Sequence, residues 1–167
     1  MGLSAVQIAA VLGGKVIAVD VSEKALAAAR ELGAVHTINS RVDNSVEVIR
    51  TLTSRGAQVS IDALGIAETC CNSVLSLRKL GRHVQLGHTT RKEAGYAPLP
   101  IDVILLNELR LYGTFGMQGQ RFGTMLAMCE AGTLKPGLVV RQKVGLEGIT
   151  GVLGSDGSLR YDWCGRD

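Results

Sequence analysis

The chain has 167 residues, of which 46% are hydrophobic and 20% are charged, and its formal net charge is +3. This length supports one domain-sized hydrophobic core, and the composition is that of a globular protein, which excludes a disordered chain. The 18 lysines and arginines are scattered along the sequence, so the clustered basic face of a nucleic-acid-binding protein is absent. No apolar stretch reaches the roughly 18 residues that span a bilayer, so no membrane partner is expected.

The four cysteines do not form a recognisable metal-binding pattern. Cys70, Cys71, Cys129 and Cys164 contain no C-x-x-C pair, and no histidine stands at zinc-ligand spacing from them. The neighbours Cys70 and Cys71 point in different directions on a helix, so they cannot hold one metal ion together. We therefore expect no metal site in this chain, reduced thiols and a cytoplasmic location.

Segments of helical periodicity alternate with apolar runs along most of the chain. The predicted helices are Gly2–Gly13, Glu23–Leu32, Ser45–Thr53, Ala67–Leu80 and Gln120–Ala131. The predicted strands are Lys15–Asp20, Val35–Asn39, Gln58–Leu64, His83–Leu86 and Leu109–Gly113. Strands that alternate with helices of this length indicate βαβ units. The predicted fold is therefore α/β, with a doubly wound parallel sheet covered by helices on both faces.

Two segments depart from this alternation. Arg91–Pro100 is polar and follows the fourth predicted strand, so we expect a surface loop at the carboxyl end of the sheet, where open α/β folds bind ligands. Val139–Val144 is a candidate for one more strand. After it, glycines recur every third residue from Gly145 to Gly157. We expect at most a weak helix over Leu146–Leu153 and a loose end over Ser155–Asp167. The expected boundaries are a domain over residues 1–145 and a glycine-rich tail over 146–167.

The strand Lys15–Asp20 ends in a carboxylate and stands between two predicted helices. This arrangement is typical of the second strand of a dinucleotide-binding half, in which the acidic residue accepts hydrogen bonds from the ribose 2′- and 3′-hydroxyls. Asp20 is therefore a candidate ribose-binding residue, and its charge would repel a 2′-phosphate, which favours NAD over NADP. Lys24 lies one helical turn further on and is a candidate for the same site. The alternatives are a turn aspartate and an exposed helix lysine.

Five segments together resemble one family. They are Met1–Ala9, Val16–Asp20 with Lys24, Ser60–Gly65, Gly81–Gly87 and Leu111–Gly116. Their order and spacing are similar to the coenzyme-binding domain of the zinc-type medium-chain alcohol dehydrogenases, over roughly residues 1–145. The resemblance implies a Rossmann-like fold whose first strand would precede Met1, as would most of the glycine fingerprint and the catalytic domain with its zinc ligands. The edge of the strand Lys15–Asp20 next to that absent strand is therefore expected to be unpaired.

The resemblance also implies a function for several residues. Gly2 corresponds to the last fingerprint glycine, at the start of a helix whose N-terminus favours a pyrophosphate. The later strand ends place Leu64, Gly65, Leu86, Gly87, Thr114 and Phe115 against the adenine and nicotinamide of NAD. The zinc is expected only in the catalytic domain, so the chain alone is expected not to oxidise alcohols. A homodimer through the edge strand near Leu109–Gly113 is the expected assembly.

Other interpretations of these residues remain open. For the glycines at the strand ends, the alternative is an ordinary turn that ends a strand. His36 and His83 are expected to be structural, and His88 is a weaker candidate for a substrate contact. Asp62, inside an apolar strand, is expected to bind backbone groups. At the level of the whole chain, the alternatives are a non-catalytic nucleotide-binding or dimerisation module and a Rossmann domain for S-adenosylmethionine.

Overall fold

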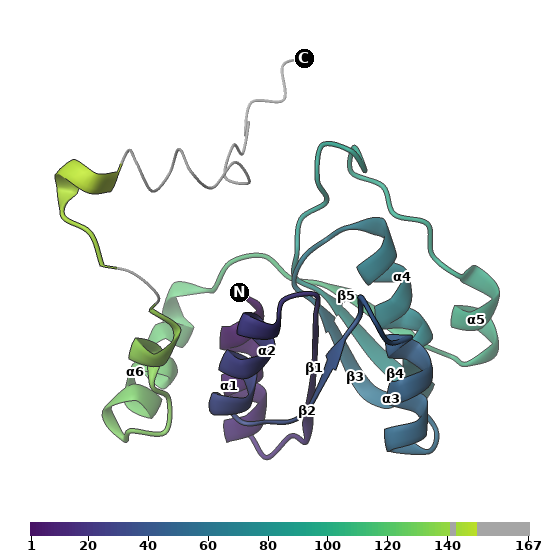
Figure 1. Ribbon diagram of the computed structural model, residues 1–167, viewed down its shortest axis with the longest axis horizontal. Helices are drawn as coiled ribbons and strands as arrows, with labels where there is room; N and C mark the ends of the chain where they lie inside the picture. Colours follow the sequence, from purple (N-terminus) through teal and green to yellow (C-terminus); the bar gives the residue numbers. More distant parts are fainter. Residues whose placement is uncertain (141–142, 150–167) are drawn as a thin grey trace. The chain divides into compact units, whose positions relative to one another are not determined.

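A computed structural model describes residues 1–140 and 143–149 of the chain (Figure 1). The chain divides into two compact units, Met1–Pro136 and Gly137–Asp167. Five strands and six α-helices are found in the described residues, and all of them belong to the first unit. In the described part of the chain, no helix is both long enough and apolar enough to cross a membrane.

The N-terminal part of the first unit is a two-stranded sheet with two helices. Its elements are α1 (Gly2–Val11), β1 (Val16–Asp20), α2 (Glu23–Glu31) and β2 (Ala34–Asn39), and the two strands pair in parallel. Helix α2 forms here because Ser22 caps its first turn, the Ser22 Oγ accepting the Ala25 N–H at 3.4 Å. It buries Leu26 and Ala29 on one face, and these side chains make part of the core with Ile38 of β2.

The remainder of the first unit contains a three-stranded parallel sheet in the order β3-β4-β5. Its elements are α3 (Ser45–Thr53), β3 (Ala57–Asp62), α4 (Ala67–Leu75), β4 (Leu77–Gln85), α5 (Ile101–Leu106), β5 (Arg110–Gly113) and α6 (Phe122–Glu130). In the register of this sheet, Asp62 pairs with Gln85, and Gln85 pairs with Gly113. The ends of three strands are thereby brought side by side, with two polar side chains, Asp62 and Gln85, next to each other.

Helices cover the strands from two sides. Helices α1 and α2 lie on one side of the strands, and α3 and α4 lie on the other (Figure 1). The carboxyl ends of the strands lie at the upper side of the unit in this view. The predicted doubly wound α/β fold with parallel strands is therefore confirmed.

The strands do not form one continuous sheet. In the described residues β1 pairs only with β2, and β3 pairs only with β4, so no ladder joins β1 to β3. Strands inside parallel sheets are normally buried on both faces. Here Val19 of β1 is 41% exposed, and Val59 and Ile61 of β3 are 46% and 42% exposed. The expected unpaired edge of the strand Lys15–Asp20 is present.

One predicted helix is too long. The helix predicted over Ala67–Leu80 ends at Leu75, and β4 begins at Leu77. The hydroxyl of Ser76 donates to the carbonyl of Asn72 at 2.6 Å at this helix end, and Leu77 then pairs with Ala57 of β3. Leu77 is buried, whereas Leu80 is 55% exposed and has a φ of 60°. The apolar spacing of this segment was compatible with a helix, but strand pairing determined the structure.

Two further segments differ from the sequence-based expectation. Helix α5 (Ile101–Leu106) was not predicted. The candidate strand Val139–Val144 is not formed by its described residues, since Val139 ends a 3-10 turn that begins at Pro136. The predicted weak helix over Leu146–Leu153 begins as a 3-10 turn at Leu146–Gly148. Residues 141–142 and 150–167, including the predicted loose end, lie outside the described residues.

Candidate functional site

Asp20 ends β1 and is exposed. Its Oδ1 accepts the backbone N–H of Ser22 at 2.8 Å, so the carboxylate also stabilises the turn into α2. A carboxylate can accept about four hydrogen bonds, so this turn contact leaves acceptors for a ligand. Lys24 is exposed in the first turn of α2. Both residues therefore lie at the carboxyl end of β1, where the sequence placed them.

Helix α1 starts at the end of β3. A Cβ atom added to Gly2 would lie 3.8 Å from the Cβ atom of Ala63, which follows β3. This is an ordinary van der Waals separation, so space alone does not demand glycine at this position. The side chain of Met1 does not cap the helix, and its first N–H groups are not satisfied from within the helix. The N-terminus of α1 is therefore a positive dipole end beside the turn that contains Leu64.

The two glycines that follow β3 and β4 have a definite structural cause. Gly65 has a φ of +91°, and a Cβ atom there would overlap the carbonyl oxygen of His88. A Cβ atom at Gly87 would lie 2.5 Å from the carbonyl carbon of Leu64. The turns after β3 and β4 are thus in direct backbone contact, and both glycines are required for it.

Apolar side chains are exposed at the same edge. Leu64 is 59% exposed and Phe115 is 73% exposed. The Phe115 ring meets the His88 ring edge to face, with centroids 5.8 Å apart. Thr114 is held at the end of β5 by its N–H, which donates to the carbonyl of Gln85 at 3.2 Å. The structure therefore gathers Leu64, Gly65, Leu86, Gly87, Thr114 and Phe115 at the carboxyl edge of β3, β4 and β5.

Asp62 is buried at the end of β3 and is 3% exposed. Its carboxylate accepts the N–H groups of Leu64 and Gly65 at 3.0 and 3.2 Å. It also accepts the Thr69 hydroxyl at 3.1 Å and the Gln85 side-chain amide at 2.9 Å. The backbone-binding role expected for Asp62 is confirmed, and the contact with Gln85 is an addition.

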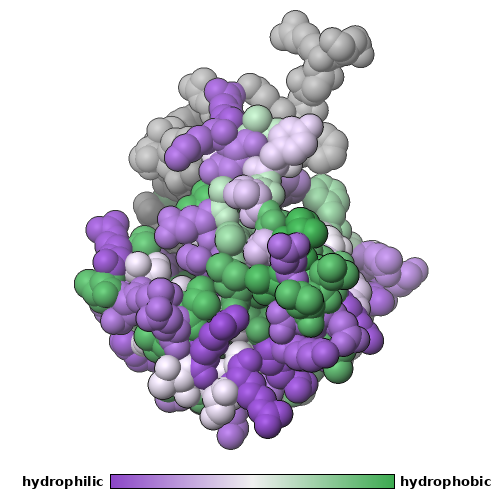
Figure 2. All heavy atoms as spheres, turned by 90° about the vertical axis from the view of Figure 1, so that its right-hand side faces the viewer, coloured by the Kyte–Doolittle hydropathy of each residue, from purple (hydrophilic) through white to green (hydrophobic). Residues whose placement is uncertain are grey.

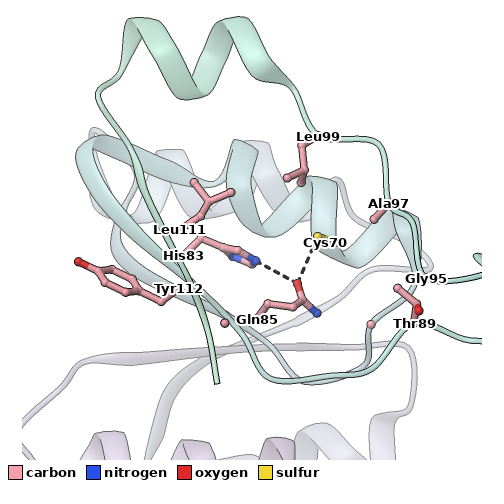
Figure 3. A pocket seen from close by; sticks show the side chains of 11 residues that line it. Cys70, His83, Gln85, Thr89, Gly95, Ala97, Leu99, Leu111 and Tyr112 are labelled. Carbon is pink, nitrogen blue, oxygen red and sulfur yellow. Dashed lines mark hydrogen bonds between the residues drawn. The ribbon is translucent and has the colours of Figure 1, made fainter. Parts of the chain in front are cut away.

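A second polar chain leads from Gln85 into the interior. The Oε1 atom of Gln85 accepts the Cys70 thiol at 3.2 Å and lies 3.1 Å from the His83 Nε2. The His83 Nδ1 lies 3.0 Å from the hydroxyl of Ser60. His83 is 2% exposed, which agrees with its expected structural role. In Figure 3 the side chains of His83 and Cys70 both point toward the side-chain oxygen of Gln85.

Cys70, His83 and Gln85 line a cavity of about 290 Å³. Its lining includes Cys70, His83, Gln85, Ala97, Leu99 and Leu111. Burial raises the pKa of the Cys70 thiol, and the negative charge of Asp62 raises it further. Cys70 is therefore held as a neutral thiol and is a poor nucleophile. In the described residues, no group of three His, Cys, Asp or Glu side chains is placed to hold a metal ion.

Sequence reasoning did not single out Gln85. The available signal was the pair His83 and Gln85, two polar residues that face the same side of a strand. Alternation places Gly81, His83 and Gln85 on one face of β4. A polar pair on an inward face needs hydrogen-bond partners, and those partners come from β3 and α4.

The fold is that of a doubly wound α/β domain, a class in which ligands bind at the carboxyl edge of the strands. Residues 1–131 match the family model described as zinc-binding dehydrogenase. The chain is 36% identical over 138 residues to an NAD-dependent alcohol dehydrogenase of Sulfurisphaera tokodaii, a match that covers 81% of this chain and 39% of that protein. It is 33% identical to sorbitol dehydrogenase of Bacillus subtilis over 69% of this chain and 32% of that protein.

Solved structures agree with these sequence matches. Benzyl alcohol dehydrogenase from Acinetobacter calcoaceticus superimposes with a TM-score of 0.83 at 26% identity, over 92% of this chain and 43% of that one. The chain belongs to the zinc-binding dehydrogenase family. It spans about two-fifths of the length of the relatives that it matches.

Proposed function

We propose that this chain is the NAD(H)-binding part of a zinc-dependent, alcohol dehydrogenase-like oxidoreductase. The observation that carries the proposal is the exposed carboxylate of Asp20 at the carboxyl end of β1. The carboxyl end of β1 lies on the same side of the unit as the start of α1 and the turns after β3 and β4 (Figure 1). The relatives named as NAD-dependent alcohol dehydrogenases support the choice of cofactor.

Each part of the edge then has a role. Asp20 accepts hydrogen bonds from the ribose hydroxyls, and Lys24 approaches the same ribose. The N-terminus of α1 at Gly2 attracts the pyrophosphate through free N–H groups and the helix dipole. The remaining groups contact the bases through apolar surface and backbone: Leu64, Gly65, Leu86, Gly87, Thr114 and Phe115.

In the whole enzyme the proposed reaction is hydride transfer between an alcohol carbon and C4 of the nicotinamide. A zinc ion held by a separate catalytic domain would supply the Lewis acid that lowers the pKa of the alcohol. The residues of this chain place and orient the cofactor. The chain alone is therefore proposed to be inactive in alcohol oxidation.

Calorimetric titration of the purified chain with NAD and with NADP tests the cofactor assignment. Saturable binding of NAD is expected, with NADP binding at least about tenfold more weakly because Asp20 repels a 2′-phosphate. Tighter binding of NADP would overturn the assignment of Asp20. Absence of binding to either dinucleotide would contradict the proposed function of this chain.

A second candidate function is a non-catalytic dimerisation module, which the free edge of the β3-β4-β5 sheet favours. All four residues of β5 are exposed, and β5 is the last strand in its sheet among the described residues. In the adjoining α5, Ile101, Leu105 and Leu106 are 66%, 70% and 73% exposed. Figure 2 shows apolar side chains gathered on the side of the unit where α5 lies. Monomeric proteins rarely expose large contiguous apolar patches, so we propose that a second copy of the chain covers α5 and β5.

Sedimentation measurements test this dimer. The wild-type chain is expected to sediment as a dimer, and Leu105→Glu is expected to raise the dimer dissociation constant by about tenfold or more, because a charge replaces an apolar contact. Val42→Glu is the matched control, since Val42 is 77% exposed in the turn before α3. A monomeric wild-type chain, or an equal effect of both variants, would contradict the proposed interface.

A further inference from the structure

The side chain of Gln85 joins two turns of the candidate site. Its Nε2 donates to the Asp62 Oδ2 at 2.9 Å and to the carbonyl oxygen of Gly87 at 2.9 Å. Its Oε1 faces the Cys70 thiol at 3.2 Å and the His83 Nε2 at 3.1 Å. Both Nε2 protons and both Oε1 acceptor positions therefore have a partner.

The partners allow only one orientation of this amide. Asp62 already receives N–H groups from Leu64 and Gly65 and the hydroxyl of Thr69, so it acts as an acceptor. A flipped amide would place Oε1 against the carboxylate and against the carbonyl of Gly87. With Nε2 fixed toward Asp62, Oε1 accepts from His83, and the His83 Nδ1 is left to accept the Ser60 hydroxyl.

This arrangement has a consequence for the edge of the sheet. Asp62 holds the N–H groups of Leu64 and Gly65 in the turn after β3. Gln85 holds Asp62 on one side and the Gly87 carbonyl in the turn after β4 on the other. The two turns are also in backbone contact at Gly65 and Gly87, so a displacement of one turn moves the other.

We propose that Gln85 is a positioning residue of the cofactor site. It fixes the turns Leu64–Gly65 and Leu86–Gly87 relative to each other through its bonds to Asp62 and to the Gly87 carbonyl. The part of this proposal that concerns the cofactor rests on the proposed function. Gln85 acts through Asp62 and the Gly87 carbonyl and is kept in its orientation by His83 and Cys70.

The first test is Gln85→Met, which keeps the volume of the side chain and removes the hydrogen bonds. Amide hydrogen exchange followed by NMR is expected to accelerate about tenfold or more at Gly65 and Gly87, with the amides of β1 and β2 unchanged. The NAD dissociation constant is expected to rise by about tenfold. Gln58→Met is the matched control, because Gln58 is exposed on β3.

A second test separates hydrogen-bond direction from packing. Gln85→Glu is nearly isosteric but places a carboxylate against Asp62, so its exchange rates at Gly65 are expected to exceed those of Gln85→Met. Combining it with Asp62→Asn restores a donor–acceptor pair between positions 62 and 85 with reversed direction, while the new carboxylate still opposes the Gly87 carbonyl. Protection of the Gly65 amide is expected to recover in this double variant. A packing role predicts the opposite order, with Gln85→Glu the milder change.

The outcomes are distinguishable from failure of the proposed function. Wild-type chain that binds no NAD contradicts the cofactor assignment, while the exchange measurements still decide the positioning role. Unchanged exchange at Gly65 and Gly87 in Gln85→Met, or no recovery in the double variant, would overturn the inference. Loss that spreads equally to β1 and β2 would show general destabilisation and would also overturn it.

Discussion

Replacing Asp62 by alanine is expected to lower the free energy of unfolding by about 4 kcal/mol. The carboxylate is 3% exposed and receives two backbone N–H groups, one hydroxyl and one side-chain amide. In Asp62→Ala these buried and partly buried donors lose their acceptor, and each donor that stays buried and unsatisfied costs about 1–3 kcal/mol. The costs do not add fully, because the turn relaxes and water reaches some of the donors.

Urea denaturation followed by circular dichroism measures this loss. Asp62→Asn is expected to cost less, about 2 kcal/mol, because one oxygen remains to accept the N–H groups while the new amide faces the amide of Gln85. Asp43→Ala is the matched control, since Asp43 is exposed before α3, and it should stay within about 0.5 kcal/mol of the wild type. A loss below about 1 kcal/mol for Asp62→Ala would contradict this network of hydrogen bonds around Asp62.

Replacing Asp20 by alanine is expected to weaken NAD binding by about 10-fold to 100-fold. Hydrogen bonds to a charged group contribute about 1.5–3 kcal/mol each, and the ribose hydroxyls lose their acceptor in this variant. The affinity for NADP is expected to stay the same or to rise, because the charge that repels a 2′-phosphate is removed. The preference between the two dinucleotides should therefore disappear.

Titration calorimetry of the Asp20→Ala variant with both dinucleotides measures the change, with Asp43→Ala as a control of equal charge. Asp20 is exposed, and its Oδ1 accepts one turn N–H at 2.8 Å. Stability should therefore fall by no more than about 1 kcal/mol. NAD affinity that is unchanged in Asp20→Ala would show that this carboxylate serves only the turn.

The alternation of strands and helices was visible in the sequence because it depends on local periodicity. The helix Ser45–Thr53 has the predicted bounds, with Asn44 capping its N-terminus through bonds to the N–H groups of Val46 and Glu47. The boundary near Leu77 was wrong because Val74 and Leu77 are both buried and have helical spacing. Pairing of Leu77 with Ala57 of β3 is a long-range contact that periodicity does not contain.

In the candidate site too, some features follow from local sequence patterns and others only from long-range pairing. Asp20 and the strand-end glycines were found from the ends of apolar runs. The links from Ser60 to His83 and from Asp62 to Gln85 each join residues 23 positions apart. They exist only because β3 and β4 pair in this register. The sequence also did not reveal that Gly65 and Gly87 contact the opposite turn, which gives both glycines a structural cause independent of any ligand.

The separation between β1 and β3 has a consequence for the cooperativity of unfolding. No backbone ladder in the described residues links the β1-β2 sheet to the β3-β4-β5 sheet. The two sheets are therefore coupled by helix packing, since α3 contacts both β2 of one sheet and β3 of the other. Under native conditions, the β1-β2 part is expected to open without breaking any ladder of the larger sheet.

A dinucleotide bound from Asp20 across to Leu64 would bridge this separation. It would bind only when both sheets are folded, and ligand that binds only the folded state stabilises it by about RT ln(1 + [L]/Kd). That free energy would act mainly on the opening of the β1-β2 part, because this is the part that can open alone. In this chain the cofactor would thus join two folding units into one cooperative domain.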